Sequence, residues 1–200
     1  MIYIVVALAA EARPLCAHFQ LDRVEELEPL SVFRRADQSL IVSGVGKERA
    51  ASAVENLAKA IPDEGPAVWL NIGVAGHRHH DIGTAVLAGQ VTDDEGGEVY
   101  RLSPPENLHL EIAEIRTVSR VETRFETDAL YEMEAAGFCQ QAGQYTSDEL
   151  LQVLKIVSDN RRTGTVCVSA HQVQGLVEKS LPKVDLLVSN LHRRARRLTG

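Results

Sequence analysis

The sequence predicts an α/β protein in which a central sheet carries helices on both faces. Short runs of apolar, β-branched residues recur along the 200-residue chain, as expected of strands buried on both sides. Segments whose apolar residues have helical spacing separate these runs, and glycines follow several of them. Strands that alternate with helices in this way favour an α/β sheet over an all-helical or all-strand fold.

The first half of the chain opens on Ile2 to Ala7, a continuous apolar run that predicts a buried strand. A turn around Ala10 leads into a helix, where Pro14 is tolerated near the start. Residues Lys47 to Ala60 have the apolar spacing of a second helix. The other strands expected here are Ser31 to Arg35, Leu40 to Ser43, Ala67 to Ile72 and Thr84 to Val91.

The second half begins with a polar stretch, Asp93 to Asn107, whose paired glycines and prolines predict a hairpin or loop. A helix is expected over Met133 to Ala142, with Gly143 just past its end. From Cys167 onward the pattern is helical, and Pro182 predicts a break between two helices. The strands expected in this half are Ile115 to Val121, Ala129 to Glu132 and Leu151 to Ser158.

Length and charge limit the classes of protein to consider. Two hundred residues suit one domain over residues 1–200, and the apolar content of 44% is ordinary for a globular chain. The formal charge of −7 argues against broad binding to the phosphates of nucleic acids. One basic run, His192 to Arg197, is predicted to be the last turn of a helix, where cations complement the helix dipole.

The cysteines and the N-terminal segment bear on the compartment. Cys16, Cys139 and Cys167 are far apart, which indicates neither a disulfide framework nor a zinc knuckle. The apolar segment Ile2 to Ala10 is too short for a membrane span and lacks the basic start of a signal peptide. We therefore expect a cytoplasmic protein that does not associate with membranes.

Two motifs suggest ligands that their details do not support. Gly44-Val45-Gly46-Lys47 lacks the Walker pattern, since Ile41 and Glu48 stand at positions that need Gly and Ser or Thr. Its glycines predict a sharp turn from strand to helix, with close approach to a ligand as the alternative. His77 to Asp81 fixes no coordination geometry, so a solvated loop is predicted there and no metal site.

Acidic residues stand where several predicted strands end. Glu11 follows the first strand, Glu132 and Glu134 sit where a strand meets a helix, and Asp159 follows the last strand. In an open α/β sheet, ligands bind beyond the carboxyl ends of the strands, so these groups should converge on one crevice. Each alone is typical of a helix start. Together they indicate glycosidic-bond chemistry, which needs an acid for the leaving group and a base for water.

The order of these motifs resembles a known superfamily. The motifs are Ala7 to Glu11, Ser43 to Lys47, Asn71 to Gly76, Asp81 to Thr84, Glu132 to Ala136 and Val157 to Asp159. In this order they resemble the purine nucleoside phosphorylase and uridine phosphorylase superfamily, most closely the methylthioadenosine/S-adenosylhomocysteine nucleosidases. Futalosine hydrolases and hopanoid-associated nucleosidases are similar too. The resemblance implies a phosphorylase/hydrolase-like three-layer fold with a mixed central sheet, and a homo-oligomer, dimer or larger.

The resemblance also implies roles for individual residues. Glu11 aligns with the glutamate that activates water, and Asp159 aligns with the acid that protonates the purine. Met133 and Glu134 align with the residues that hold the ribose and its hydroxyls.

Two further positions complete the predicted substrate site, and two departures accompany them. Val74 is expected near the sugar, and Lys155 stands where the family has an orienting arginine. The stretch from His77 to Tyr131 is shorter than in the nucleosidases, and Ser119 to Thr123 holds no aromatic for base stacking. Phe125 is expected on a loop rather than in the pocket wall.

We therefore expect an N-ribosyl hydrolase that acts on a purine-like nucleoside without metal or organic cofactor. Two alternatives stay open: a phosphate-dependent phosphorylase, and a catalytically inactive protein of the same fold that binds a nucleoside or a protein partner. The trio Glu11, Glu134 and Asp159 favours an enzyme, whereas the shortened base region favours the inactive protein.

Overall fold

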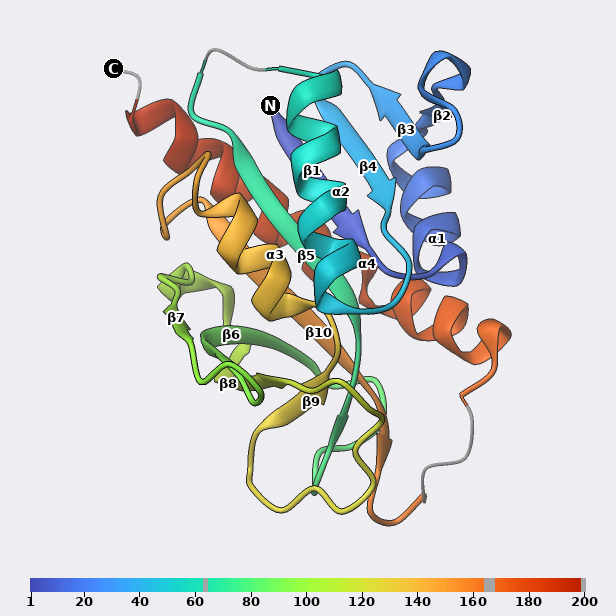
Figure 1. The fold of residues 1–200 in the computed structure, drawn as a ribbon, viewed down its shortest axis with the longest axis vertical. Helices are drawn as coiled ribbons and strands as arrows, with labels where there is room; N and C mark the ends of the chain where they lie inside the picture. The colour runs from blue at the N-terminus through green and yellow to red at the C-terminus, as the bar shows by residue number, and fades with distance from the viewer. Residues whose placement is uncertain (63–64, 164–167, 199–200) are drawn as a thin grey trace.

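The computed structural model describes residues 1–62, 65–163 and 168–198, and these form one mixed sheet with helices on both faces (Figure 1). The α/β prediction is thereby confirmed. Cys167, where the sequence predicts the helical region to begin, lies outside the described residues. Among the described residues, no helix is both long enough and apolar enough to cross a bilayer.

The centre of the sheet consists of four parallel strands. They are β1 (Ile2–Val6), β4 (Gln38–Val42), β5 (Val68–His77) and β10 (Leu151–Asn160), in the order β4-β1-β5-β10. Their side chains are almost all buried, as expected of strands covered on both faces. The antiparallel strands β3 (Ser31–Arg35) and β2 (Asp22–Arg23) extend the sheet beyond β4.

On the other side the sheet closes into a ring. From β10 it passes through β6 (Ala85–Asp93), β8 (Glu111–Thr117) and β9 (Leu130–Glu132) back to β5. Strand β7 (Val99–Arg101) forms a hairpin with β6, which confirms the hairpin predicted between Asp93 and Asn107.

Strand β5 changes its neighbour along one edge. It pairs with β1 over Val68–Asn71 and with β9 only at Gly76 and His77. Between these two pairings, neither β1 nor β9 pairs with residues 72–75. Strand β10 pairs with this stretch along the opposite edge, so only the backbone N–H groups that point away from β10 are left for side chains. The candidate site lies at this edge, where Val74 N binds Glu11.

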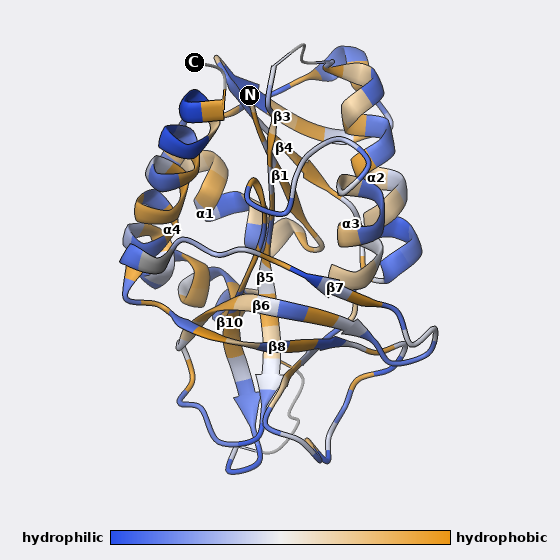
Figure 2. Ribbon diagram, turned by 90° about the vertical axis from the view of Figure 1, so that its left-hand side faces the viewer, coloured by the Kyte–Doolittle hydropathy of each residue, from blue (hydrophilic) through white to orange (hydrophobic). Residues whose placement is uncertain are grey.

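The helices divide between the two faces (Figure 2). Helices α1 (Ala9–Phe19) and α4 (Ala170–Leu198) cover one face, and α2 (Lys47–Ala60) and α3 (Ala135–Ala142) cover the other. Short 3₁₀ turns lie at Glu25–Leu27 and Glu106–Leu108.

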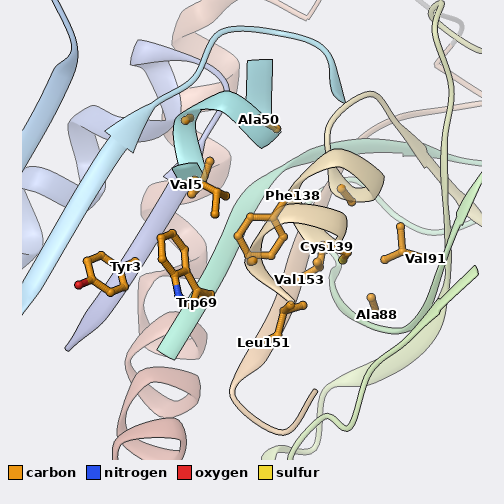
Figure 3. Packing of buried hydrophobic residues seen from close by; sticks show 14 of the residues in the cluster. Tyr3, Val5, Ala50, Trp69, Ala88, Val91, Phe138, Cys139, Leu151 and Val153 are labelled. Atoms are coloured by element: carbon orange, nitrogen blue, oxygen red, sulfur yellow. The ribbon is translucent and has the colours of Figure 1, made fainter. Parts of the chain in front are cut away.

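Strand β1 shows how the two cores are built. Ile2, Ile4 and Val6 enter the core beneath α1 and α4, and the alternate residues Tyr3 and Val5 enter the core beneath α2 and α3. In that second core Tyr3 stacks on Trp69 with ring centroids 4.4 Å apart, and Phe138 of α3 points toward the same cluster (Figure 3).

The predictions at Pro182 and at the strand after β7 are wrong. Pro182 does not break the last helix, because α4 is continuous from Ala170 to Leu198. Pro182 faces solvent, where water can bind the carbonyl that loses its helical N–H, while Val177 and Val184 pack in the core on either side. The strand predicted over Ile115 to Val121 is β8, Glu111–Thr117. Pairing with β6 and β9 fixes its register more strongly than its half-exposed residues do.

Candidate active site

The predicted site residues gather around a cavity of about 280 Å³ where β1 and β9 separate along β5. Five of the six predicted residues line this cavity, and Lys155 does not. The five are Glu11, Val74, Met133, Glu134 and Asp159. They come from α1, β5, the β9–α3 junction and β10, so the fold joins segments that are far apart in the sequence.

Glu11 lies in the first turn of α1 and is only 2% exposed. Its Oε2 accepts hydrogen bonds from the backbone N–H groups of Ala7 and Leu8, both at 2.9 Å. Its Oε1 accepts one from Val74 N at 3.1 Å, at the unpaired edge of β5. Burial raises the pKa of Glu11, although the nearby Lys155 ammonium and the three N–H groups oppose the increase. The result is a carboxylate fixed in place that binds a proton more readily than an exposed glutamate.

Lys155 lies beneath the cavity and is 1% exposed. Its Nζ is 2.8 Å from Glu132 Oε2 and 3.9 Å from Glu134 Oε2. A Cβ atom added at Gly73 would lie 3.0 Å from Glu11 Oε1 and 3.2 Å from Lys155 Nζ, so a larger residue there would press on both charged groups. The predicted contact of Lys155 with substrate stays a prediction. In the structure, Lys155 forms ion pairs with Glu132 and Glu134, and its charge also acts on Glu11.

Glu132 fixes the start of α3. Besides Lys155, its carboxylate accepts Thr117 Oγ1 at 2.6 Å and the backbone N–H groups of Glu134 and Ala135. A buried anion at a helix N-terminus satisfies donors that the helix cannot. The sequence analysis placed Glu132 among the acidic residues at strand ends. Its position as the last residue of a short buried strand, directly before a helix, could have indicated that it binds the start of that helix.

Glu134 is held from the opposite side of the cavity. Its Oε1 accepts a hydrogen bond from Gly46 N at 3.0 Å, and Gly46 has a φ of 114° that favours glycine. The glycine turn before α2 is therefore both a sharp turn and a contact to a site residue. Burial raises the pKa of Glu134 to about 7; the Lys155 ammonium opposes this, and the negative charge of Glu132 adds to it.

Asp159 owes its position to a β-bulge. Val157 pairs with Ala75 and Asp159 with Gly76, so Ser158 is the extra residue in β10. Bulges of this kind turn a side chain toward a site. Ser158 Oγ lies 2.7 Å from Asp159 Oδ1 and donates to it. Asp159 was expected after the last strand, but β10 continues to Asn160.

Phe125 corrects the expectation that it lies on a loop away from the pocket wall. It is 1% exposed and lines the cavity, with its ring against the Cα of Gly76 and tilted on Tyr131 at 5.8 Å. The backbone beside it is held by Arg161 Nε, which donates to Arg124 O at 2.7 Å. A single phenylalanine among polar residues could have indicated a buried side chain. The backbone at Phe125 is a loop, as expected, but its side chain is buried.

The predicted solvated loop at His77 to Asp81 is wrong for His77, which ends β5 and is buried. Its Nδ1 accepts the backbone N–H groups of His79 and His80, and its Nε2 donates to Asp128 O at 3.3 Å. Among the described residues, no group of histidine, cysteine or carboxylate side chains could hold a metal ion.

Comparison with known proteins gives matches among solved structures. No protein-family model and no curated protein sequence matches the chain. It is similar to the 5'-methylthioadenosine nucleosidase of Arabidopsis thaliana, with a TM-score of 0.81, 16% identity and 95% of each chain covered.

Two proteins of Helicobacter pylori are also similar. The 5'-methylthioadenosine/S-adenosylhomocysteine nucleosidase has a TM-score of 0.73, 16% identity and coverage of 94% of this chain and 97% of that one. Futalosine hydrolase has a TM-score of 0.72, with the same identity and coverage. These matches confirm, at the level of the fold, the resemblance that the motifs indicated: this chain has the three-layer fold of the nucleosidases.

Proposed function

We propose that this protein hydrolyses the N-glycosidic bond of a purine-like nucleoside. The observation that carries the proposal is that Glu11, Glu134 and Asp159, from three distant segments, line a single cavity. A base, a group for the sugar and an acid are the parts that this reaction needs. The fold shared with proteins named as nucleosidases supports the same reaction class.

The contacts support distinct roles in the reaction. Among the described residues, Glu11 Oε1 receives one hydrogen bond, so its second lone pair is available to a water. That water attacks the anomeric carbon and gives its proton to Glu11. The bond to the base breaks, and the departing purine takes a proton at N7 from Asp159. Positive charge that develops on the sugar is stabilised by the nearby carboxylates.

The sugar is assigned to Val74, Met133 and Glu134, which line the same cavity as Glu11 and Asp159. Gly46 N occupies Glu134 Oε1, so Oε2 is the oxygen that can bind a ribose hydroxyl. A carboxyl group with a pKa of about 7 can accept or donate a hydrogen bond at neutral pH. The leaving base is assigned to the side of Phe125 and Tyr131, whose rings provide a surface for stacking.

Water rather than phosphate is the proposed nucleophile. Phosphate sites gather cations, and the described lining of this cavity includes no lysine or arginine. Lys155, the nearest cation, is occupied by Glu132. This observation disfavours the phosphorylase alternative. We further propose a single domain, on the basis of chain length, and a cytoplasmic location, on the basis of the cysteines and the N-terminal segment. We also propose a homo-oligomer, as the motif resemblance implies.

The test is a panel of purine and pyrimidine nucleosides, with and without phosphate, read by release of free base. We expect base and free ribose from at least one purine-like nucleoside, at a rate independent of phosphate. Release that needs phosphate and yields ribose 1-phosphate would show a phosphorylase. Binding of nucleosides by calorimetry without any base release would favour the inactive protein.

A further inference from the structure

A second cavity, of about 730 Å³, lies away from the candidate active site, along the C-terminal part of α4. Its other wall is the segment between β7 and β8. Figure 1 shows this end of α4 close to the chain's N terminus, whereas the glycine turn before α2 and the start of α1 lie further down the molecule. The lining includes Arg193, Arg194, Arg197, Asn190, Ser103 and Asn107.

The arginines share one face of the helix. Positions 190, 193, 194 and 197 are spaced by three and four residues, so their side chains are neighbours on the same surface. Every one of these four side chains is a hydrogen-bond donor, and the guanidinium groups of the three arginines stay charged at all physiological pH values. The helix therefore presents a concentrated positive charge to the cavity.

Arg194 connects the two walls of the cavity through hydrogen bonds to backbone carbonyl groups. Its Nη1 donates to Ser103 O at 2.6 Å and Glu149 O at 3.2 Å, and its Nη2 donates to Pro104 O at 3.4 Å. All three acceptors are neutral carbonyl groups, which orient the guanidinium but do not neutralise it. The segment after β7 is tied to the helix by the same contacts, so the shape of the cavity is fixed.

Arg193 and Arg197 extend the charge toward solvent. Both side chains are exposed, and the described residues of the cavity lining include no aspartate or glutamate. Elsewhere in this acidic chain arginines do find carboxylates, as Arg116 does at 2.7 Å from Asp94. The helix dipole accounts for a cation in the last turn. The helix dipole does not account for Arg193, which lies one turn earlier, or for the cavity between this helix and the segment that contains Ser103.

We propose that this cavity binds a small anion that carries at least two phosphate groups. Guanidinium groups bind phosphate oxygens through paired, charge-assisted hydrogen bonds. Arg193 and Arg197 lie one helical turn apart, so two linked phosphate groups can give each guanidinium its own phosphate. The volume lies within the usual range of small-molecule sites, about 300–1,000 Å³. The site is independent of the proposed glycosidic chemistry, because it shares no lining residue with the first cavity.

Calorimetric titration of the full chain with inorganic pyrophosphate tests the proposal. Pyrophosphate has no sugar or base, so it does not present the groups assigned to the active site. We expect saturable binding at one site, weakened at least tenfold in the double variant Arg193→Gln/Arg197→Gln. Arg194 is left in place because it anchors the wall. The matched control is Arg34→Gln, an exposed arginine on β3, which should bind as the wild type does.

Two outcomes would overturn the proposal: no saturable binding by the wild type at low salt, or equal affinity in the double variant. Circular dichroism should show the same helix content in all three proteins, since the substituted side chains are exposed. The double variant should release free base at the wild-type rate. Failure of anion binding would therefore appear in calorimetry, and failure of the proposed hydrolysis would appear in base release by the wild type.

Discussion

The candidate active site has two walls of different construction. The charged wall contains Glu11, Glu132, Glu134 and Lys155, and each carboxylate there accepts backbone N–H groups at about 3 Å. The aromatic wall contains Phe125, on the chain between β8 and β9, where the described backbone forms turns and bends, and Tyr131, in β9. The first wall is held by buried charge and the second by packing on Gly76.

The two walls correspond to two parts of the proposed reaction, acid–base chemistry and recognition of the base. Acid–base chemistry needs fixed geometry, and the charged wall provides it through a lysine shared by several carboxylates. Recognition of the base needs only a surface of suitable shape, which a loop can provide. Substitutions in the charged wall should therefore affect folding and turnover together, whereas those in the aromatic wall should mainly affect substrate affinity.

The largest expected effect follows removal of the shared cation. Lys155→Met leaves Glu132 buried without its partner, which should lower the free energy of unfolding by about 3–5 kcal/mol. Urea denaturation monitored by circular dichroism measures this. The control Lys59→Met breaks an exposed ion pair and should leave the free energy of unfolding nearly unchanged. Equal losses in the two variants would mean that the charged wall does not depend on Lys155.

The pH dependence of stability should identify Glu134. Its pKa of about 7 in the folded protein lies above the ordinary value of 4.5, so the folded state holds the proton more tightly than the unfolded state. The resulting stability is fully present below pH 4.5 and is lost as the pH rises through 7; it amounts to about 3 kcal/mol at 1.36 kcal/mol per unit.

Urea titrations between pH 4.5 and 8 measure this effect in the wild type and in Glu134→Gln. The difference in unfolding free energy between the two proteins should change with pH in this window, because glutamine does not titrate. Burial also raises the pKa of Glu11, so the wild-type curve contains contributions from both groups, and the Glu134→Gln curve shows what Glu11 alone contributes. If the difference in unfolding free energy did not change with pH, a group other than Glu134 would be responsible for the pH dependence.

The aromatic wall should respond through affinity. Phe125→Leu keeps an apolar side chain but removes the ring, so KM for the best purine nucleoside should rise several-fold, the scale of about 0.5–1.5 kcal/mol for aromatic pairing. The turnover number should change less than twofold. Steady-state kinetics separate the two constants. A large fall in turnover with an unchanged KM would assign Phe125 to the chemical step instead.

The smallest effect is expected at the start of α2. Lys47 Nζ lies 2.8 Å from Asp93 Oδ2 on the β6–β7 hairpin, next to the Gly46 N–H that binds Glu134. Lys47→Met should lower the unfolding free energy by about 1 kcal/mol or less and turnover only a few-fold. Kinetics and urea denaturation of one preparation measure both. Loss of activity as large as in a Glu134 variant would make this turn part of the catalytic apparatus.

The parallel strands could be predicted from the sequence, because their apolar runs are continuous and buried on both faces. The positions of Glu11, Glu134 and Asp159 followed from the same reasoning, since strand ends meet at one edge of a sheet. The region between His77 and Tyr131 was harder to predict. Strand β8 begins four positions earlier than expected, and Phe125 is buried, because contacts with distant segments decide both.

The Ser158 bulge and the Lys155 contacts had no local signal either. A bulge depends on the register between β5 and β10, which one strand's sequence does not contain. The partner of Lys155 depends on β9 being brought beside β5. The sequence pattern therefore predicted which acidic residues lie at strand ends, and only the fold showed the contacts that fix their side chains.

The most direct test of the central claim compares wild type and Glu11→Gln in base release without phosphate. Glutamine keeps the shape of the side chain but cannot accept a proton, so turnover should fall at least about a hundredfold. The control Glu48→Gln, on the exposed start of α2, should keep wild-type turnover. Wild-type turnover in Glu11→Gln, with the fold intact, would contradict the proposed role of Glu11 as the base that activates water.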